Sequence, residues 1–190
     1  MNKPSGFDEV KVGGDFTPIE LGGHHAKIVS VKEQKSKTNR DMVVVALDFA
    51  PNDKQAGYFK DLYDKDDRQD KKWPFNAVHY IVTEDNDGKC SRNFKGFITA
   101  FEDSNKTNVL WNDKFCEQFK GKKIGVVYGE VEEEYNGEVK TRRRIRWFCD
   151  DAKVDTQKIP EIKSLNNFST SGTAEGFTSI DNVDADEIPF

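Results

Sequence analysis

The sequence contains few cysteines and no long apolar run. Its three cysteines, Cys90, Cys116 and Cys149, are odd in number and far apart, which does not indicate a disulfide framework. The mean hydropathy is −0.79, and no stretch is long and apolar enough to cross a bilayer. Residues 1–7 also lack the apolar stretch of a signal peptide. We therefore expect a cytoplasmic protein from a reducing compartment, without contact to a membrane.

The residue sets of common catalytic and metal sites are missing as well. None of the three histidines is spaced with Cys, Asp or Glu in the way that a zinc site requires. Residues 85–88 (Asp-Asn-Asp-Gly) resemble the start of a calcium loop, but Phe94 then takes the place of the bidentate Glu. The Glu-Val-Lys at 138–140 resembles an element of some nucleases, yet no upstream Asp is suitably placed. We therefore expect a protein that is not an enzyme and that holds no cofactor or metal.

The negative charge of the chain is concentrated at its C-terminal end. The sequence has 29 Lys and Arg against 34 Asp and Glu, a formal net charge of −5. Residues 164–190 contain no Lys or Arg and the following acidic residues: Glu175, Asp181, Asp184, Asp186 and Glu187. Residues 1–163 are therefore charge-balanced, and the pI of about 5.3 reflects the tail. An acidic pI of this origin does not exclude nucleic-acid binding by the body of the chain.

The chain divides into three regions by composition. Residues 1–20 mix Gly, Pro and charged residues without a clear period, and we expect an N-terminal arm. Residues 21–163 carry the regular patterns of a folded domain. Residues 164–190 are rich in Ser, Thr, Asn and Gly, which predicts a disordered, flexible linker that ends in an acidic tip. Within the domain, the densely charged residues 52–72 indicate an insertion whose form the pattern does not determine.

Strand patterns dominate the domain. Runs rich in β-branched and aromatic residues lie at 24–32, 42–50 and 77–83. Two further runs, 122–132 and 138–149, flank Asn136-Gly137, a dipeptide that tolerates the positive φ angles of a type I′ hairpin turn.

One segment has the pattern of a helix. Apolar residues with the spacing of one helical face are Phe94, Phe97, Ile98 and Phe101, and Ser91 precedes them as a cap. The element order predicts a mainly β fold: an OB-type five-stranded barrel with one amphipathic helix, plus a disordered acidic C-terminal tail. A small sandwich with one packed helix fits almost as well.

The two faces of the expected hairpin differ in character. A two-residue turn would place Tyr128 opposite Ile145 and Val126 opposite Trp147, on an apolar face that we expect in the core. The other face would collect Lys140, Arg142, Arg144, Arg146 and Phe148. Cations in register repel one another unless an anion neutralises them, which favours a polyanionic ligand. The alternative is a solvated basic strand edge, balanced by the acidic residues of 61–70.

Glycines, aromatic residues and loop cations also favour a polyanionic ligand. Glycines at 125 and 129 would leave room on the basic face for a phosphate or a base. Three aromatic residues lie among lysines rather than aliphatic residues and are candidates to stack on bases, at about 1–3 kcal/mol per base: Tyr63, Trp73 and Phe75. Four cations lie at or near the first inter-strand loop, at the edge of an OB groove: Lys32, Lys35, Lys37 and Arg40. The alternatives are core aromatics and an ordinary solvated loop.

Several short blocks of the chain resemble a known family. They lie at 94–99, 102–105, 119–123, 128–130 and 144–148. Together they are similar to single-stranded DNA-binding proteins carried by phages and mobile elements of Gram-positive bacteria. The resemblance spans residues 21–163 and implies a protein that works in the cytoplasm of a bacterial host.

The end of the tail carries a second resemblance. Residues 186–190 (Asp-Glu-Ile-Pro-Phe) resemble the acidic tip with which bacterial single-stranded DNA-binding proteins recruit partner enzymes to coated DNA. This resemblance implies a docking role for Asp184, Asp186, Glu187, Ile188, Pro189 and Phe190. The usual N-terminal strand sequence of the bacterial family is not present, so the family's tetramer does not carry over and a homo-oligomer stays open.

These observations together give a functional hypothesis. We expect a non-catalytic, sequence-tolerant protein that coats single-stranded DNA during phage or mobile-element replication, recombination and repair. Its C-terminal tip would recruit replication and recombination proteins. The alternative is an interaction adaptor, a recombination accessory factor without DNA binding of its own.

Overall fold

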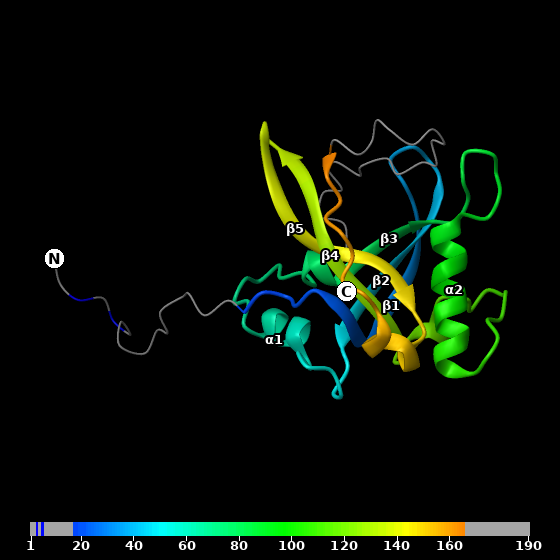
Figure 1. Cartoon of the computed structure of the whole chain (residues 1–190), viewed down its shortest axis with the longest axis horizontal. Coiled ribbons are helices and arrows are strands. Elements are labelled where there is room, and N and C mark those ends of the chain that lie inside the picture. Colours follow the sequence, from blue (N-terminus) through cyan, green and yellow to red (C-terminus); the bar gives the residue numbers. More distant parts are fainter. Residues whose placement is uncertain (1–2, 4, 6–16, 166–190) are drawn as a thin grey trace.

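Five antiparallel strands form one sheet with the order β3-β2-β1-β4-β5 (Figure 1). The computed structural model describes residues 3, 5 and 17–165. The strands are β1 (Gly22–Lys35), β2 (Asp41–Phe49), β3 (Val78–Val82), β4 (Lys123–Tyr135) and β5 (Glu138–Cys149). The helices are α1 (Tyr58–Asp64) and α2 (Arg92–Asn105), with short 3-10 turns η1 (Phe75–Ala77), η2 (Glu117–Phe119) and η3 (Asp151–Thr156). Within the described part of the chain no pairing joins β3 to β5, so these strands are the two edges of an open barrel.

The fold class expected from the sequence is confirmed. The structure is mainly β, with five strands and an amphipathic helix between the third and the fourth. The charged residues 52–72 form a turn, helix α1 and a loop. Ile19, within the expected N-terminal arm, is buried in the main core. The expected disordered tail covers residues 164–190, of which 166–190 lie outside the described residues, whereas Ser164 and Leu165 donate hydrogen bonds to the Glu132 carboxylate. No helix of the described residues is long and apolar enough to span a membrane.

The main core lies between the inner face of the sheet and α2. Alternate residues of β2 point inward and are buried: Val43, Val45, Leu47 and Phe49. The helix contributes the apolar stripe that its spacing predicts: Phe94, Phe97, Ile98 and Phe101. Its N-cap is confirmed, because the Ser91 hydroxyl accepts a hydrogen bond from the Phe94 backbone N–H at 3.1 Å.

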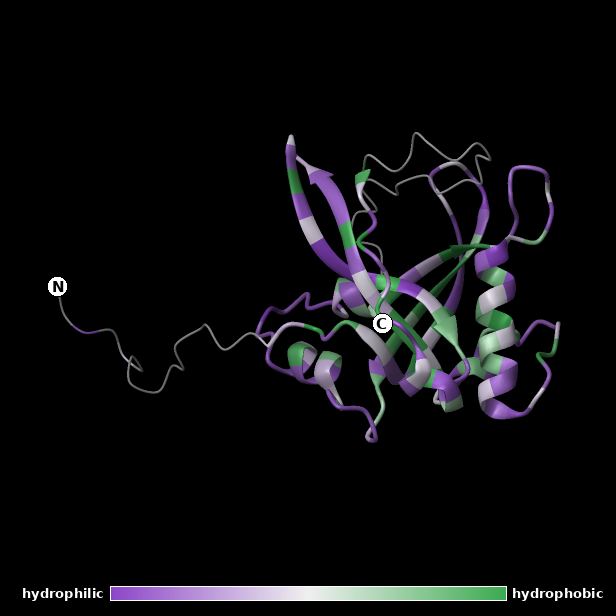
Figure 2. Cartoon of the chain, viewed as in Figure 1, coloured by the Kyte–Doolittle hydropathy of each residue, from purple (hydrophilic) through white to green (hydrophobic). Residues whose placement is uncertain are grey.

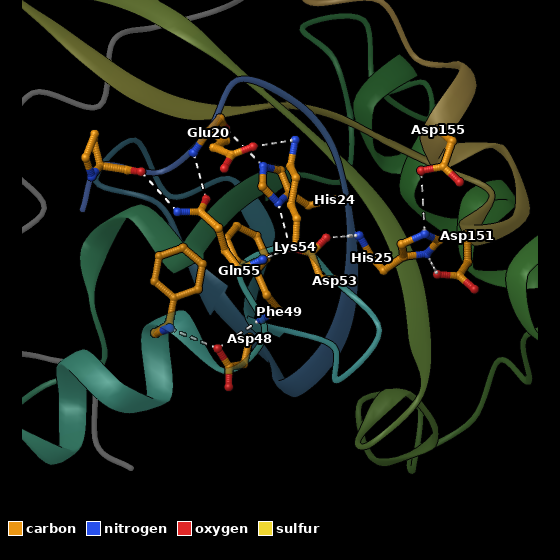
Figure 3. Close-up of polar contacts among 12 residues, drawn as sticks. Glu20, His24, His25, Asp48, Phe49, Asp53, Lys54, Gln55, Asp151 and Asp155 are labelled. Atoms are coloured by element: carbon orange, nitrogen blue, oxygen red, sulfur yellow. Dashed lines mark hydrogen bonds and ion pairs between the residues drawn. The ribbon is translucent and has the colours of Figure 1, made fainter.

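A network of carboxylates and histidines ties the turn after β2 to the start of β1 (Figure 3). His24 is fully buried, with Nδ1 3.0 Å from Asp53 and Nε2 2.9 Å from the Glu20 carbonyl oxygen. Each ring nitrogen of His24 thus has an oxygen within hydrogen-bond distance. Asp53 also accepts from the His25 backbone N–H at 2.7 Å. These contacts hold residues 17–21 against the barrel and therefore have a structural role.

The β4–β5 hairpin projects beyond the barrel and is mostly hydrophilic there (Figure 2). Its turn has the expected conformation, with φ of 53° at Asn136 and 79° at Gly137. The expected register is confirmed from the turn to the Tyr128–Ile145 pair.

The expected register is wrong beyond that pair. A bulge at Arg146 shifts the pairing by one residue, so that Val126 faces Phe148 and Val127 faces Trp147. One extra residue turns the side chains that follow to the opposite face of the strand. Phe148 therefore packs against the main core, whereas Trp147 is 39% exposed. The expectation that Phe148 lies with the cations on the nucleic-acid-binding face of the hairpin is therefore wrong.

Residues 150–165, which we call the strap, cross the outer side of β1 and β4. A Cβ at Gly125 would lie 2.8 Å from Val154, and one at Gly129 would lie 2.4 Å from Pro160. The space above these glycines is filled by the chain itself, so the expectation that it receives a phosphate or a base is wrong. At its end the strap pairs with the hairpin, where Lys163 forms a parallel bridge to Val131.

Candidate nucleic-acid interface

A second, smaller apolar cluster lies on the outer face of the sheet. Its buried members are Val44, Ala46 and Val78, and the side chains packed around them are Val29, Trp73 and Tyr80. These strand residues alternate with the β2 and β3 residues of the main core, so they point to the opposite side of the sheet. The small side chains form a floor on which larger rings lie.

Four aromatic rings, which we call the aromatic strip, lie on or beside this floor: Tyr63, Trp73, Phe75 and Tyr80. The centroids of Tyr63 and Trp73 are 5.4 Å apart, and those of Phe75 and Tyr80 are 6.3 Å apart. The Trp73 indole donates a hydrogen bond to the Leu47 carbonyl at 3.0 Å, which fixes its ring against β2. Phe75, in the turn η1, is 48% exposed. The structure thus brings together the three aromatic residues expected from the sequence and adds Tyr80.

Cations flank the aromatic strip. The Lys71 Nζ lies 4.6 Å from the centroid of Tyr63, and the Arg144 Cζ lies 4.5 Å from that of Phe75. Lys32 pairs with Val44, which pairs in turn with Tyr80. Directly paired residues share a face of the sheet, so Lys32 belongs to the same outer face as the strip.

Arg144 connects the strip to the hairpin. Its guanidinium donates to both carboxylate oxygens of Glu133, at 2.7 and 2.8 Å, and also to the side-chain oxygen of Asn76. Its side chain is only 21% exposed. Burial of the Tyr80 ring raises the pKa of its hydroxyl, so this member of the strip stays neutral at neutral pH.

The other hairpin cations have different surroundings. Lys140 pairs with Glu138 at 2.9 Å, and Arg142 is exposed. Arg146, at the bulge, donates to the carbonyl oxygens of Glu130 and Glu161, and burial lowers the pKa of its guanidinium. Arg146 is therefore a clamp for the strap, and the expected row of four cations is reduced to Lys140, Arg142 and Arg144.

The cations of the first loop lie at the end of the β1–β2 pair. Lys35 forms an ion pair with Asp41 at 2.7 Å, and Arg40 donates to the Glu84 carbonyl. Lys37 is exposed. The β1–β2 turn and the tip of the hairpin both project upward in Figure 1, on opposite sides of the barrel.

The interface contains residues that pattern reading did not select. The sequence pattern could have identified Tyr80 as an outward-facing residue, because it lies between the inward-facing His79 and Ile81 in a short strand. The role of Asn76 could not be identified in this way, since it acts on Arg144 from 68 residues away; Glu133 lies on the same hairpin face as Arg144, 11 residues before it.

The expected docking tip cannot be placed in this arrangement. Its residues, Asp184, Asp186, Glu187, Ile188, Pro189 and Phe190, lie outside the described residues. The described chain ends at Leu165, whose backbone N–H donates to the Glu132 carboxylate at 3.2 Å.

Within the described residues no group of His, Cys, Asp and Glu side chains could hold a metal ion. No protein-family model and no curated protein sequence matches this chain.

Proposed function

We propose that the protein binds single-stranded DNA without regard to sequence and without catalysis. The observation that supports this most directly is the aromatic strip on the outer face of the sheet, with cations at both ends. Single-strand binders combine rings on which bases stack with a basic groove that follows the backbone. Every base has a π-face, so this type of contact tolerates any sequence.

The residues of the interface divide by role. Tyr63, Trp73, Phe75 and Tyr80 stack on bases. Lys32, Lys71, Arg142 and Lys140 contact phosphates along and beyond the strip. Binding of this kind releases counterions, so the affinity falls with salt at a slope near −0.7 per phosphate contacted.

The acidic tail supplies the second part of the proposal. Its resemblance to the tip of bacterial single-stranded DNA-binding proteins supports recruitment of replication, recombination and repair proteins to coated DNA. The blocks of resemblance within 21–163 support an origin in a phage or a mobile element of a Gram-positive bacterium. In this proposal the domain holds the strand, and the tail holds the partner.

A titration of a fluorescent oligonucleotide tests the strand-binding role. Phe75→Ala removes a ring that is 48% exposed; the loss of one stacked base weakens binding by about 5- to 150-fold. Trp111→Ala is the matched control, because Trp111 is 68% exposed but packs against Phe94 and Phe115 of the main core. Equal effects of the two substitutions, a preference for duplex, or no binding at low salt would contradict the proposal.

One observation favours the adaptor as a second candidate function. Leu110 and Trp111 are neighbours in the loop after α2 and are 63% and 68% exposed. Large exposed apolar side chains that cluster mark surfaces for other proteins. A pull-down with and without nuclease separates the two functions: partners of an adaptor survive nuclease treatment and do not depend on Phe75.

A further inference from the structure

The guanidinium of Arg144 lies where the aromatic strip meets the hairpin, and its hydrogen-bonding edge is already occupied. Nε and one terminal nitrogen donate to the two carboxylate oxygens of Glu133, at 2.7 and 2.8 Å. The other terminal nitrogen donates to Asn76. The Cζ of Arg144 lies over the Phe75 ring, 4.5 Å from the centroid. Arg144 is therefore held in place by three residues, of which only Glu133 is charged.

A carboxylate and a phosphate use the same fork of an arginine. Both accept two parallel N–H bonds from the guanidinium, and both neutralise its charge. Glu133 thus occupies on Arg144 the position that a backbone phosphate would take beside a base stacked on Phe75. The Glu133 side chain is 38% exposed, against 21% for Arg144, so Glu133 is the partner that can turn into solvent.

We propose that Glu133 is an internal competitor of the DNA backbone. An arriving phosphate displaces the Glu133 carboxylate from Arg144, while Phe75 and Asn76 keep the guanidinium in position. This inference rests on the proposed strand-binding function and adds a residue that sets its affinity. No covalent change is involved, only the exchange of one anion for another.

The geometry distinguishes this ion pair from the others near the interface. Lys140–Glu138 and Lys35–Asp41 join flexible lysines to carboxylates, with side chains between 47% and 71% exposed. Such solvated pairs contribute little and open readily. Arg144–Glu133 is bidentate, half-buried and in contact with a ring of the strip. Exchange of Glu133 for a phosphate in this ion pair would therefore change the affinity for a bound strand.

Glu133→Gln tests the proposal with little change in shape. The amide keeps an oxygen that accepts from Arg144 but removes the charge that repels a phosphate. In bulk water a unit charge about 4 Å from a phosphate is worth about 1 kcal/mol, and near a protein surface more, so we expect a gain in oligonucleotide affinity of about fivefold or greater.

Glu134→Gln is the matched control. Glu134 is exposed, neighbours Glu133 in β4 and points to the opposite face of the hairpin, where it pairs with Val139. It removes the same charge from the same hairpin, so any general electrostatic gain appears in both variants. In the double variant Glu133→Gln/Arg144→Met the specific gain should disappear. Urea unfolding of each variant verifies that the fold is kept.

The outcomes separate this inference from the function on which it rests. If the unaltered protein binds the oligonucleotide and Glu133→Gln behaves as Glu134→Gln does, the competitor role is refuted and strand binding stands. A weaker affinity in Glu133→Gln would likewise refute it, since Glu133 would then act only to position Arg144. If the unaltered protein and every variant fail to bind at low salt, both proposals fall.

Discussion

Acidification should destabilise this protein through one ring inside the barrel. His79, on the inner face of β3, makes an edge contact with Phe148 of β5, with ring centroids 5.5 Å apart. Burial lowers the pKa of His79 to about 4, from an ordinary value of 6.5. The ring is therefore neutral at pH 7 and bridges the two edge strands of the open barrel as an apolar group.

The direction of the effect follows from proton linkage. Between pH 6.5 and pH 4 the unfolded chain binds a proton at His79 that the folded chain does not. The free energy of unfolding therefore falls with pH through this window and levels off below it. The difference of 2.5 pKa units sets a limit of about 3 kcal/mol, of which about 2 kcal/mol is lost between pH 7.5 and pH 5.

Urea unfolding between pH 5 and pH 7.5 measures this effect directly. His79→Gln keeps a polar side chain of similar size that does not titrate, so the variant reports the pH dependence of every other group. From pH 7.5 to pH 5 the free energy of unfolding of the unaltered protein should fall by about 2 kcal/mol more than that of the variant. Parallel curves would refute the reasoning, because they would show that the folded state accepts the proton at His79 as readily as the unfolded state does.

Two further predictions concern the hairpin and the tail. Phe148→Ala should lower the free energy of unfolding by about 2–3 kcal/mol and Trp147→Ala by less than about 1 kcal/mol, because the bulge turns Phe148 to the core; the reverse order in urea unfolding would contradict the register. Deletion of residues 166–190 should leave oligonucleotide affinity unchanged or raised, since it removes five acidic residues, and should abolish partner capture in a pull-down. Loss of oligonucleotide binding would contradict the separation of roles, and a peptide appended to Phe190 should impair capture alone.

The parts of the fold that the sequence predicted are those with strong local signals. Asn136-Gly137 determines its own turn, and Ser91 with the apolar stripe behind it determines its own helix. The bulge at Arg146 has no such signal, because one extra residue leaves the composition of the strand unchanged. At the bulge Arg146 donates to the strap carbonyl of Glu161, a long-range contact that the local pattern does not reveal.

The interface shows the same division. Tyr63, Trp73 and Phe75 stand out in the sequence because each lies among lysines, and the structure groups them with Tyr80. Pattern reading misjudged the glycine at 125, because a strand glycine admits a close neighbour without showing whether that neighbour is a ligand or the chain itself. Only long-range contacts decide between these meanings.

The strap has a consequence for the order in which the molecule assembles. Val154 meets Gly125 of β4 and also Gly23 near the start of β1, so its seat exists only after these strands have paired. Contacts that join segments far apart in the sequence pay the loop-closure entropy of all that lies between them. We therefore expect the strap to dock after β1 and β4 have paired; it follows all five strands in the sequence, so it leaves a ribosome after them. The end of the strap, where Ser164 and Leu165 donate to the Glu132 carboxylate of the hairpin, is thus positioned only on an assembled sheet.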